Sequence, residues 1–459
     1  MSKAPAARAS PPRSVIPGPP EPLSLLDIRS DPLQFIRDLT ARHGDIVAYR
    51  APGWSAVLVN RPEFVRHVLL ENFRNYGKEG TPDLMMLKPM LGDGLLTSSG
   101  ATWKRQRQTL QPVFHPAAIR QYVAVMIEAT ESMLDRWEAR GAAASFDLVP
   151  AMSDLTLRIV ARALFGYDVA PQSDRFGTAV EDLNETMGHL DPTDAATARR
   201  FAKALAVVRE TVTRVIQDES RDATADDALA VMLRDTGIAS VGEAVARAEV
   251  VDQVLTLLLA GHETTAKALA WTLYLLATHQ DAERTVLQEI ADTLGDRTPT
   301  AETTERMPYA WAVIQESARL YPPIWLMSRR ALDDDEIGGY RIAAGTLVVF
   351  SPFLLHRRAD LWPQPETFRP ERFLGEADHG AVSEFSYLPF SGGPRHCVGK
   401  HFAALEMRIV LPLILRRFSV RLRAGHPVEP QALVTLRPRY GLPVTAVKRT
   451  RNAGANVEL

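Results

Sequence analysis

Cysteine is almost absent from this chain, which has a single one, Cys397, among 459 residues. A lone thiol excludes an intramolecular disulfide framework and any cluster built on several thiolates, whether of zinc or of iron and sulfur. Such a composition fits a reducing compartment, and we expect a cytoplasmic protein.

Long apolar runs and an excess of one charge are missing as well. No stretch reaches the ~18 apolar residues that a membrane-spanning helix needs, and the N-terminus lacks the hydrophobic core of a signal peptide. Positive and negative side chains nearly cancel, leaving a net charge of -2. We therefore expect no transmembrane anchor and no nucleic-acid partner.

The chain nevertheless has the means to bury a large core, because 46% of its residues are hydrophobic. Residues 1–22 are rich in proline, alanine and arginine, a composition that cannot form a packed core, and we predict a disordered N-terminal arm there. No linker interrupts the rest, so residues 23–459 are predicted to form a single domain.

Apolar residues recur with helical spacing through much of the chain, and residues 101–278 are predicted to be almost entirely helical. The longest helix is expected to begin at a capping box of Ser240 and Glu243 and to keep one apolar stripe as far as Leu276. Residues 75–100 lack a clear period and are predicted to form a loop.

The alternation of apolar and polar residues that is typical of strands is confined to short segments. Residues 45–60 predict a hairpin around Pro52-Gly53, and residues 337–350 and 434–447 predict short strands. The predicted fold class is therefore mostly α with a minor β part, of the α+β kind.

Cys397 lies in the loop Phe390-Ser-Gly-Gly-Pro-Arg-His-Cys397-Val-Gly-Lys400, directly before an amphipathic helix predicted over 398–417. The positive end of the helix dipole, with Arg395 and Lys400 nearby, favours a thiolate over a thiol. A thiolate is either a nucleophile or a metal ligand. The ordinary alternative is that the residue is a small buried hydrophobe.

Small and polar residues interrupt the longest predicted helix at Leu259-Ala-Gly-His-Glu-Thr-Thr265. Gly261 costs ~1 kcal/mol relative to alanine in a helix interior, and it offers room for a group to lie against the helix. Glu263 beside Thr264 is a plausible pair for delivering protons. A helix kink with a solvated glutamate would give the same pattern.

Two further sets of charged residues suggest buried contacts. Glu316 and Arg319 share a helix face and, with Arg372, could form a network that fixes the segment upstream of the cysteine. Trp103 and Arg107 lie one turn apart and suit a planar anionic ligand, although surface packing often gives the same spacing.

Taken together, these motifs resemble the cytochromes P450, the haem-thiolate monooxygenases of the soluble bacterial type. The cysteine loop matches the family signature F-x-x-G-x-R-x-C-x-G, and the other motifs follow in the family's order. The residues that carry the likeness are Trp103, Arg107, Ala260, Gly261, Glu263, Thr264, Glu316, Arg319, Arg372, Phe390, Gly393, Arg395, Cys397 and Gly399.

The resemblance implies the family's fold, with haem b (iron protoporphyrin IX) between the long central helix and the helix after the cysteine loop. Residues 23–459 would be a haem-thiolate catalytic domain with Cys397 as the axial iron ligand. The haem would also be contacted by Phe390, Gly393, Gly399, Ala260 and Gly261, with Trp103, Arg107, Arg329 and Arg395 at its propionates.

The same resemblance assigns roles on the other side of the haem. Thr264 would hold water and oxygen while Glu263 helps relay protons. The substrate pocket would be lined by Met86, Leu87, Leu257, Ile324, Trp325 and Thr435. Most of these side chains are apolar, so we expect a hydrophobic substrate of medium or large size, hydroxylated or epoxidised with O2.

Electrons would come from a separate ferredoxin or flavodoxin with its NAD(P)H reductase, steered by a basic patch of Lys104, Arg105, Lys400, Arg408 and Arg416. We expect a monomer. The alternatives are a peroxide-using or rearranging enzyme of the same fold, a haem-binding sensor, and an acyl transferase with Cys397 as nucleophile. Glu263 and Thr264 argue against the first two, and the missing third member of a catalytic triad argues against the last.

Overall fold

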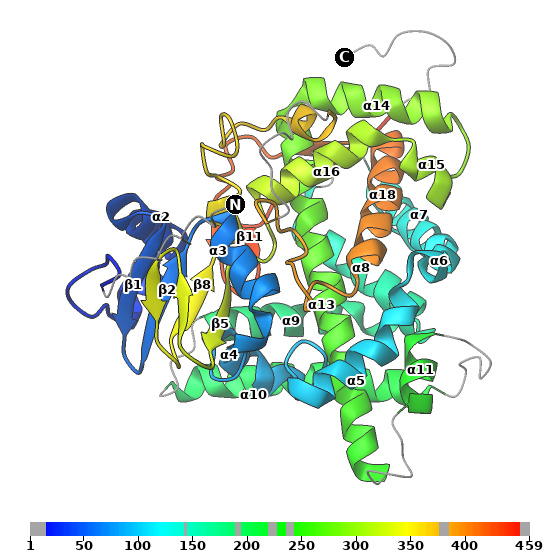
Figure 1. The fold of residues 1–459 in the computed structure, drawn as a ribbon. Coiled ribbons are helices and arrows are strands. Elements are labelled where there is room, and N and C mark those ends of the chain that lie inside the picture. Colours follow the sequence, from blue (N-terminus) through cyan, green and yellow to red (C-terminus); the bar gives the residue numbers. More distant parts are fainter. Residues whose placement is uncertain are drawn as a thin grey trace, which may run out of the picture. The chain divides into compact units, whose positions relative to one another are not determined.

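The computed structural model describes residues 15–141, 145–188, 194–218, 227–235, 243–375 and 385–449. These residues form two compact units (Figure 1). The smaller unit consists of the segments up to Met85, Leu326–Leu355 and Ser383–His396, and the larger unit contains the rest. Each unit therefore draws on segments that are far apart in the sequence.

The smaller unit is built on a five-stranded sheet with the order β1-β2-β8-β5-β3. Strands β2 and β8 pair in parallel, and the other neighbours are antiparallel. The unit's elements are α1 (Leu25–Ser30), α2 (Pro32–His43), β1 (Ile46–Ala51), β2 (Trp54–Val59), α3 (Pro62–Arg66), β3 (Tyr76–Gly77), β5 (Met327–Ala331), β6 (Asp335–Ile337), β7 (Tyr340–Ile342), β8 (Leu347–Phe350) and α17 (Pro352–Leu355).

The predicted hairpin over 45–60 is present as β1 and β2, which are paired from Ile46 with Val59 to Ala51 with Trp54. Strand β8 is buried along its whole length, as expected of a strand in the middle of a sheet. Val57, Val348 and Phe350 belong to the core that the sheet shares with the helices of its unit.

Only part of the predicted N-terminal arm lies among the described residues, from Val15 onward. Here the carbonyl of Pro17 accepts a hydrogen bond from the N–H of Ala48 at 2.8 Å, and the carbonyl of Pro20 accepts one from the Arg50 side chain at 2.9 Å. This part of the arm therefore lies along strand β1 rather than free.

The larger unit is mainly helical, as predicted for residues 101–278. Its helices are α5 (Gly100–Leu110), α6 (Pro116–Ile119), α7 (Val123–Ala139), α8 (Leu148–Phe165), α9 (Ser173–Gly188), α10 (Ala195–Gln217), α11 (Ala228–Asp235), α13 (Glu243–Thr278), α14 (Gln280–Leu294), α15 (Ala301–Glu305), α16 (Pro308–Leu320) and α18 (Lys400–Arg417). Helix α4 (Pro82–Leu91) crosses the boundary between the units.

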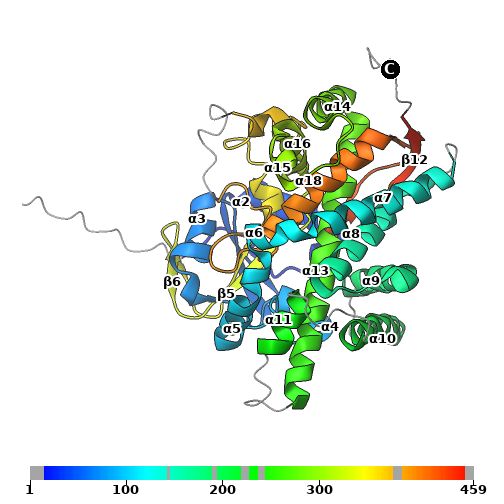
Figure 2. The same ribbon diagram turned by 90° about the vertical axis from the view of Figure 1, so that its right-hand side faces the viewer.

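Helix α13 is the long element around which the larger unit packs. It has 36 residues, which at 1.5 Å each gives about 54 Å. Helices α8, α16, α10 and α18 all contact it, and α18 packs against α7 as well (Figure 2). Ser240, the predicted cap of this helix, lies outside the described residues.

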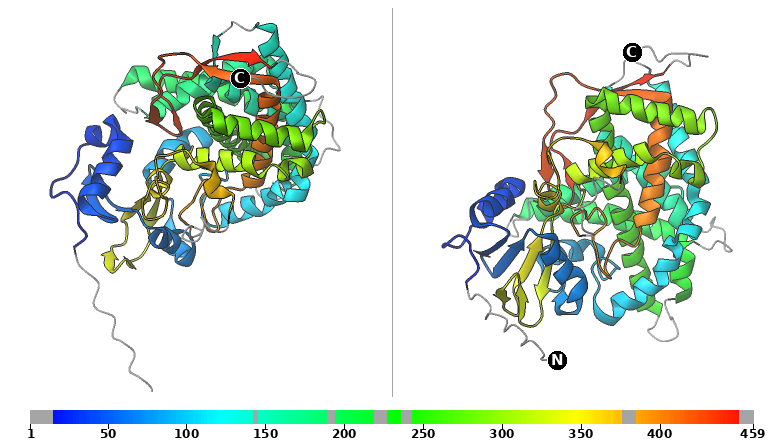
Figure 3. Two further views of the ribbon diagram at one scale, coloured as in Figure 1. Left: turned by 90° about the horizontal axis from the view of Figure 1, so that it is seen from above. Right: turned by 45° about the horizontal axis from the view of Figure 1, so that its top comes forward.

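The strands of the larger unit are few and short, in line with the predicted minor β part. They are β4 (Ser145–Asp147), β9 (Phe418–Leu422), β10 (Pro430–Ala432), β11 (Leu436–Pro438) and β12 (Pro443–Lys448). Strand β12 lies between β4 and β9 (Figure 3), while β10 and β11 form a separate hairpin.

The prediction of a loop over 75–100 was wrong, because this segment contains strand β3 and helix α4. The helix is capped at its start by the Thr81 hydroxyl, which accepts a hydrogen bond from the N–H of Leu84 at 3.4 Å. Its run of consecutive apolar residues and the internal Pro89 hide the helical period that would have revealed it.

Candidate haem and oxygen site

The cysteine loop ends two residues later than predicted, because helix α18 begins at Lys400 with Gly399 as its N-cap. The side chain of Cys397 is accessible at the surface of the larger unit, so it is not the small buried hydrophobe of the ordinary alternative. Its sulfur could therefore be reached by a ligand.

The protein around Cys397 does not by itself stabilise a thiolate. Atoms packed about the sulfur raise the pKa of the thiol, and this effect outweighs the backbone N–H of Gly399 and the charges of Arg107 and Lys400, which lower the pKa. The N-terminus of α18 thus stabilises a thiolate less than the sequence suggested. A metal ion removes this difficulty, because coordination deprotonates a thiol outright.

Gly393 holds the first half of the same loop in a conformation that requires glycine. Its φ is +67°, and a Cβ atom there would lie 1.9 Å from the carbonyl oxygen of Leu69. Ser391 also has a positive φ of 59°, which is strained for a residue with a side chain. Phe390, beside them, is half-buried. The loop is therefore tightly constrained within the smaller unit.

Three cations gather in the smaller unit around residues predicted to bind propionates. Burial, with the charges of Arg329 and Arg395, lowers the pKa of Lys78 to about 7. Burial and Arg329 lower the pKa of Arg395 to about 10, and burial lowers that of Arg329 as well. The carboxylates of Asp83 and Glu79 offset part of this charge. Such a cluster fits an added dianion, as the two haem propionates would be.

Trp103 and Arg107 lie on α5 in the larger unit. Arg107 is buried, which lowers its pKa, and the charge of a Cys397 thiolate would oppose that effect. Trp103 is half-buried. This pair places a guanidinium near the sulfur, in keeping with a site for an anionic cofactor.

The motif of small and polar residues over 259–265 in α13 has an accessible face formed by Ala260, Gly261 and Thr264. The Thr264 hydroxyl donates to the carbonyl of Ala260 at 2.9 Å, as expected for a threonine that loosens the helical ladder. Gly261 also serves packing: a Cβ atom there would lie 3.1 Å from the Val160 side chain on α8. A residue with a side chain there would require Val160 to shift by a few tenths of an ångström.

Glu263 lies in a buried polar cluster of the larger unit. Its Oε1 accepts hydrogen bonds from Asn184 at 3.0 Å and from Thr435 at 3.2 Å, and it lies 3.2 Å from Nζ of Lys267. The solvated glutamate of the alternative interpretation is therefore wrong, since Glu263 is only 7% exposed.

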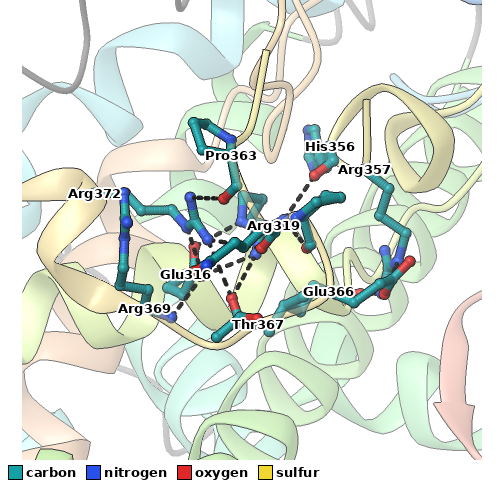
Figure 4. A network of polar contacts seen from close by, with 12 residues as sticks. Glu316, Arg319, His356, Arg357, Pro363, Glu366, Thr367, Arg369 and Arg372 are labelled. Atoms are coloured by element: carbon teal, nitrogen blue, oxygen red, sulfur yellow. Dashed lines mark hydrogen bonds and ion pairs between the residues drawn. The ribbon is translucent and has the colours of Figure 1, made fainter. Parts of the chain in front are cut away.

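The predicted network of Glu316, Arg319 and Arg372 is present in the larger unit (Figure 4). Arg319 makes a two-pronged contact with the Glu316 carboxylate at 2.7 and 2.8 Å, and Arg372 reaches the same carboxylate at 3.1 Å. Both members of the first pair are fully buried. The two arginines also donate to main-chain carbonyls of His356, Pro363, Gln364, Pro365 and Thr367.

The predicted pocket residues are placed on four segments of the larger unit. Met86 and Leu87 are half-buried on α4, and Leu257 is buried on α13. Ile324 and Trp325 are half-buried after α16. Thr435 is buried in the turn between β10 and β11, where the Trp325 indole donates to the carbonyl of Leu433 at 2.8 Å.

Part of the predicted basic patch is engaged within the protein. Arg105 pairs with Glu249 at 2.6 Å, Arg408 stacks over Trp311 at 4.3 Å, and Arg416 donates to the carbonyl of Arg297 at 2.8 Å. Lys104 is exposed and Lys400 is half-buried. These two lysines remain as candidates for contact with an electron donor.

Sequence reasoning missed Lys78, Lys267 and Asn184. Lys267 follows Glu263 by four residues, so its contact could have been found from helical spacing. Lys78 could not have been found, because it lies after strand β3, whose partner β5 is remote in the sequence. Asn184 is on a different helix from Glu263.

Within the larger unit, the accessible Cys397 at the start of α18, with the buried Arg107 guanidinium nearby, could ligate a metal ion as a thiolate. The family model described as Cytochrome P450 matches residues 17–444. Because this match covers nearly the whole chain, the chain belongs to the cytochrome P450 family. Its family and its likeness to a named monooxygenase identify it as a haem-thiolate monooxygenase.

Several curated relatives are similar over most of their length. Cyclooctatin synthase of Streptomyces melanosporofaciens is 37% identical over 88% of this chain and 89% of the relative. Cyclooctat-9-en-7-ol 5-monooxygenase of the same organism is 36% identical over 85% of each. Putative cytochrome P450 132 of Mycobacterium tuberculosis is 33% identical over 89% of this chain and 91% of the relative. The helices among the described residues include none long and apolar enough to cross a membrane.

Proposed function

We propose that this monooxygenase hydroxylates or epoxidises a hydrophobic organic molecule at haem b ligated by Cys397. The two electrons would come from a ferredoxin or flavodoxin with its NAD(P)H reductase. The observation that carries the proposal is the Cys397 thiol, which is accessible at the N-terminus of α18 with the buried Arg107 guanidinium nearby.

Haem with a thiolate ligand supplies the activation of O2 when it is bound. The protein's part is to hold the cofactor and to manage protons. The Gly399 N–H stabilises negative charge on the Cys397 sulfur. Lys78, Arg329 and Arg395 would hold a propionate in the smaller unit, and Trp103 with Arg107 would do so in the larger one.

Protons would be delivered from the α13 motif. The Thr264 hydroxyl donates to the Ala260 carbonyl and keeps its lone pairs for accepting a hydrogen bond on the accessible face of the helix. Glu263, one residue away, would first take up a proton from water and then pass it through water to Thr264. An oxygen-using monooxygenase needs such a relay, whereas a peroxide-using enzyme or a sensor does not.

The relatives suggest where to look for the substrate. One of them is named for acting on cyclooctat-9-en-7-ol, and the candidate pocket residues here are mostly apolar, with Trp325 and Thr435 as the polar exceptions. We therefore infer a hydrophobic molecule of medium or large size. Screening for a shift of the haem Soret band would begin with cyclooctat-9-en-7-ol, followed by terpenes, fatty acids and macrolides.

The organisation of the chain supports a single catalytic domain over residues 23–459, because segments of the smaller unit are interleaved in sequence with those of the larger. The nearly balanced charge and lone cysteine agree with our inference of a cytoplasmic monomer. Size-exclusion chromatography with light scattering measures the oligomeric state, and a dimer would contradict that part of the proposal.

The decisive experiment is the spectrum of the purified protein reduced under carbon monoxide. We expect the strongly red-shifted Soret band of thiolate-ligated haem, and we expect Cys397→Ala to abolish it. A matched variant in the same loop, Ser391→Ala, retains the band. A spectrum of histidine-ligated haem, or persistence of the band in Cys397→Ala, would exclude Cys397 as the ligand.

A further inference from the structure

Three elements of the larger unit meet at one oxygen atom of Glu263. Oε1 is approached by Nζ of Lys267 at 3.2 Å from the same helix, by the Asn184 amide at 3.0 Å from α9, and by the Thr435 hydroxyl at 3.2 Å from the turn before β11. All three groups are donors. The three donors therefore share one carboxylate oxygen.

The partner one turn along α13 is a buried cation. Lys267 is only 1% exposed, and a lysine is rarely buried so completely unless it is paired. Burial on its own would raise the pKa of Glu263, but the charge of Lys267 and the hydrogen bonds to Glu263 outweigh it, so the pKa lies below its ordinary value. The pair thus keeps Glu263 as a carboxylate inside the protein.

The second oxygen of Glu263, Oε2, is left out of this arrangement. Oε2 lies 4.0 Å from Nε2 of the neighbouring His262. The other ring nitrogen of His262 lies 2.7 Å from the carbonyl of Leu258, to which it must donate, and burial lowers the pKa of this histidine. The ring is therefore neutral, and Nε2 has a lone pair instead of a proton to offer Oε2.

The donors are themselves fixed by further contacts. Arg437 on β11 pairs with Glu181 and Glu185 of α9, so the strand and the helix are tied together beside the cluster. The Trp271 indole on α13 donates to the carbonyl of Leu436 at 3.1 Å, which ties the start of β11 to the long helix. The three groups around Oε1 are thus held on a rigid frame.

We propose that Lys267, with Asn184 and Thr435, is a positioning residue of the reaction. It fixes Glu263 through Oε1 so that Oε2 is the oxygen that exchanges protons with Thr264. A proton that reaches Oε2 from a water molecule passes through water to the Thr264 hydroxyl, which gives up its own proton to the site, and Glu263 ends as the carboxylate that it was. This inference rests on the proposed role of Glu263 and Thr264.

The test compares holoenzyme variants in a reconstituted ferredoxin system, with the compound that gives the largest Soret shift in the screen above. For Lys267→Met we expect product per NADH to fall five- to tenfold and peroxide release to rise, with haem content and the carbon monoxide spectrum unchanged. Lys448→Met removes a lysine from a surface pair with Glu138 and serves as the matched control.

A structural role for Lys267 is separated from a positioning role by a double variant. Glu263→Gln/Lys267→Met removes both charges, so its thermal midpoint should return toward the wild-type value while its coupling stays low. Recovery of coupling along with stability would overturn the proposal. If Lys267→Met fails to fold, Asn184→Leu provides the test, with an expected two- to fivefold loss of coupling and an unchanged haem content. Coupling at the wild-type level in that variant would equally overturn it.

Failure of this inference is distinguishable from failure of the proposed function. Thr264→Ala and Glu263→Gln report on the relay itself. If both are uncoupled while Lys267→Met is coupled to within twofold of the wild type, only the positioning role is wrong. If all three retain coupling, the proposed relay is wrong, and the inference falls with it.

Discussion

At the scale of single residues, the ionisable groups of the site are governed by the balance between burial and close neighbours. For Glu263 the neighbours prevail and its pKa is lowered, whereas for Cys397 the atoms packed about the sulfur prevail and the pKa is raised. Burial prevails for Lys78 as well, and its pKa is lowered to about 7. The haem that the family implies would bring a metal ion to the Cys397 sulfur and negatively charged propionates to Lys78.

We expect Lys78→Met to weaken the retention of haem, because the variant loses one of three cations available to a propionate. A charge-assisted hydrogen bond contributes about 1.5–3 kcal/mol, so haem should be lost to apomyoglobin roughly ten times faster. Lys88→Met, on α4 and paired with Asp93 at 2.8 Å, is the control and should lose haem at the wild-type rate. Equal rates for both variants would remove Lys78 from the cofactor site.

How far the sequence could predict the site is clearest from individual contacts. Glu316 and Arg319 were predictable, since their spacing on a helix is enough to bring them together. The buried setting of Glu263 was not, because two of its three donors come from residues that only tertiary packing brings near. Motif recognition named Cys397 as a ligand, but it could not show that the atoms packed about the sulfur raise the pKa of the thiol.

At the scale of elements, the buried carboxylate of Glu316 joins helix α16 to the segment 356–372. Besides the two arginines, Glu316 accepts a hydrogen bond from the backbone N–H of Arg369 at 2.9 Å, so the segment is anchored by its main chain as well. A segment without regular secondary structure has no hydrophobic period from which the sequence could predict its course. Its course is set by Arg319 and Arg372 donating to carbonyls.

His356, whose carbonyl accepts from Arg319, makes this region sensitive to acid. Burial, with the charges of Arg319 and Arg357, lowers the pKa of His356 to about 3. Since an unfolded histidine titrates near 6.5, the unfolded chain binds the proton first as pH falls. The stabilisation is complete above pH 6.5 and is lost toward pH 3.

We therefore expect His356→Gln, which cannot titrate, to lessen the acid sensitivity of the protein. Between pH 7 and pH 5 the wild type should lose about 2 kcal/mol more of its free energy of unfolding than the variant does. Urea unfolding of both proteins at the two pH values measures the difference. A parallel decline would show that His356 is not protonated on unfolding in this range.

At the scale of the whole molecule, an electron donor must find the protein by diffusion. The net charge is only -2, so attraction of an acidic partner depends on local charge. Three of the five predicted basic residues are held in internal contacts, which leaves Lys104 and Lys400. Lys400 is three residues from Cys397 in the sequence, at the first turn of α18.

The double variant Lys104→Glu/Lys400→Glu should slow reduction of the haem iron by an acidic ferredoxin about tenfold at low ionic strength, with the difference shrinking as salt screens the charges. Stopped-flow reduction under carbon monoxide measures this rate directly. Lys203→Glu, an exposed lysine on α10, should have little effect. A rate independent of both salt and charge reversal would place the donor elsewhere.

The parallel pairing of β2 with β8 has a consequence for biosynthesis. Ala56 of β2 is registered with Leu347 of β8, so the sheet cannot close until that later strand has left the ribosome. At about 5–20 residues per second, this delay is roughly 15–60 s. During that time the β1–β2 hairpin exposes an unpaired apolar edge in a crowded cell, which makes the nascent chain a natural client for chaperones.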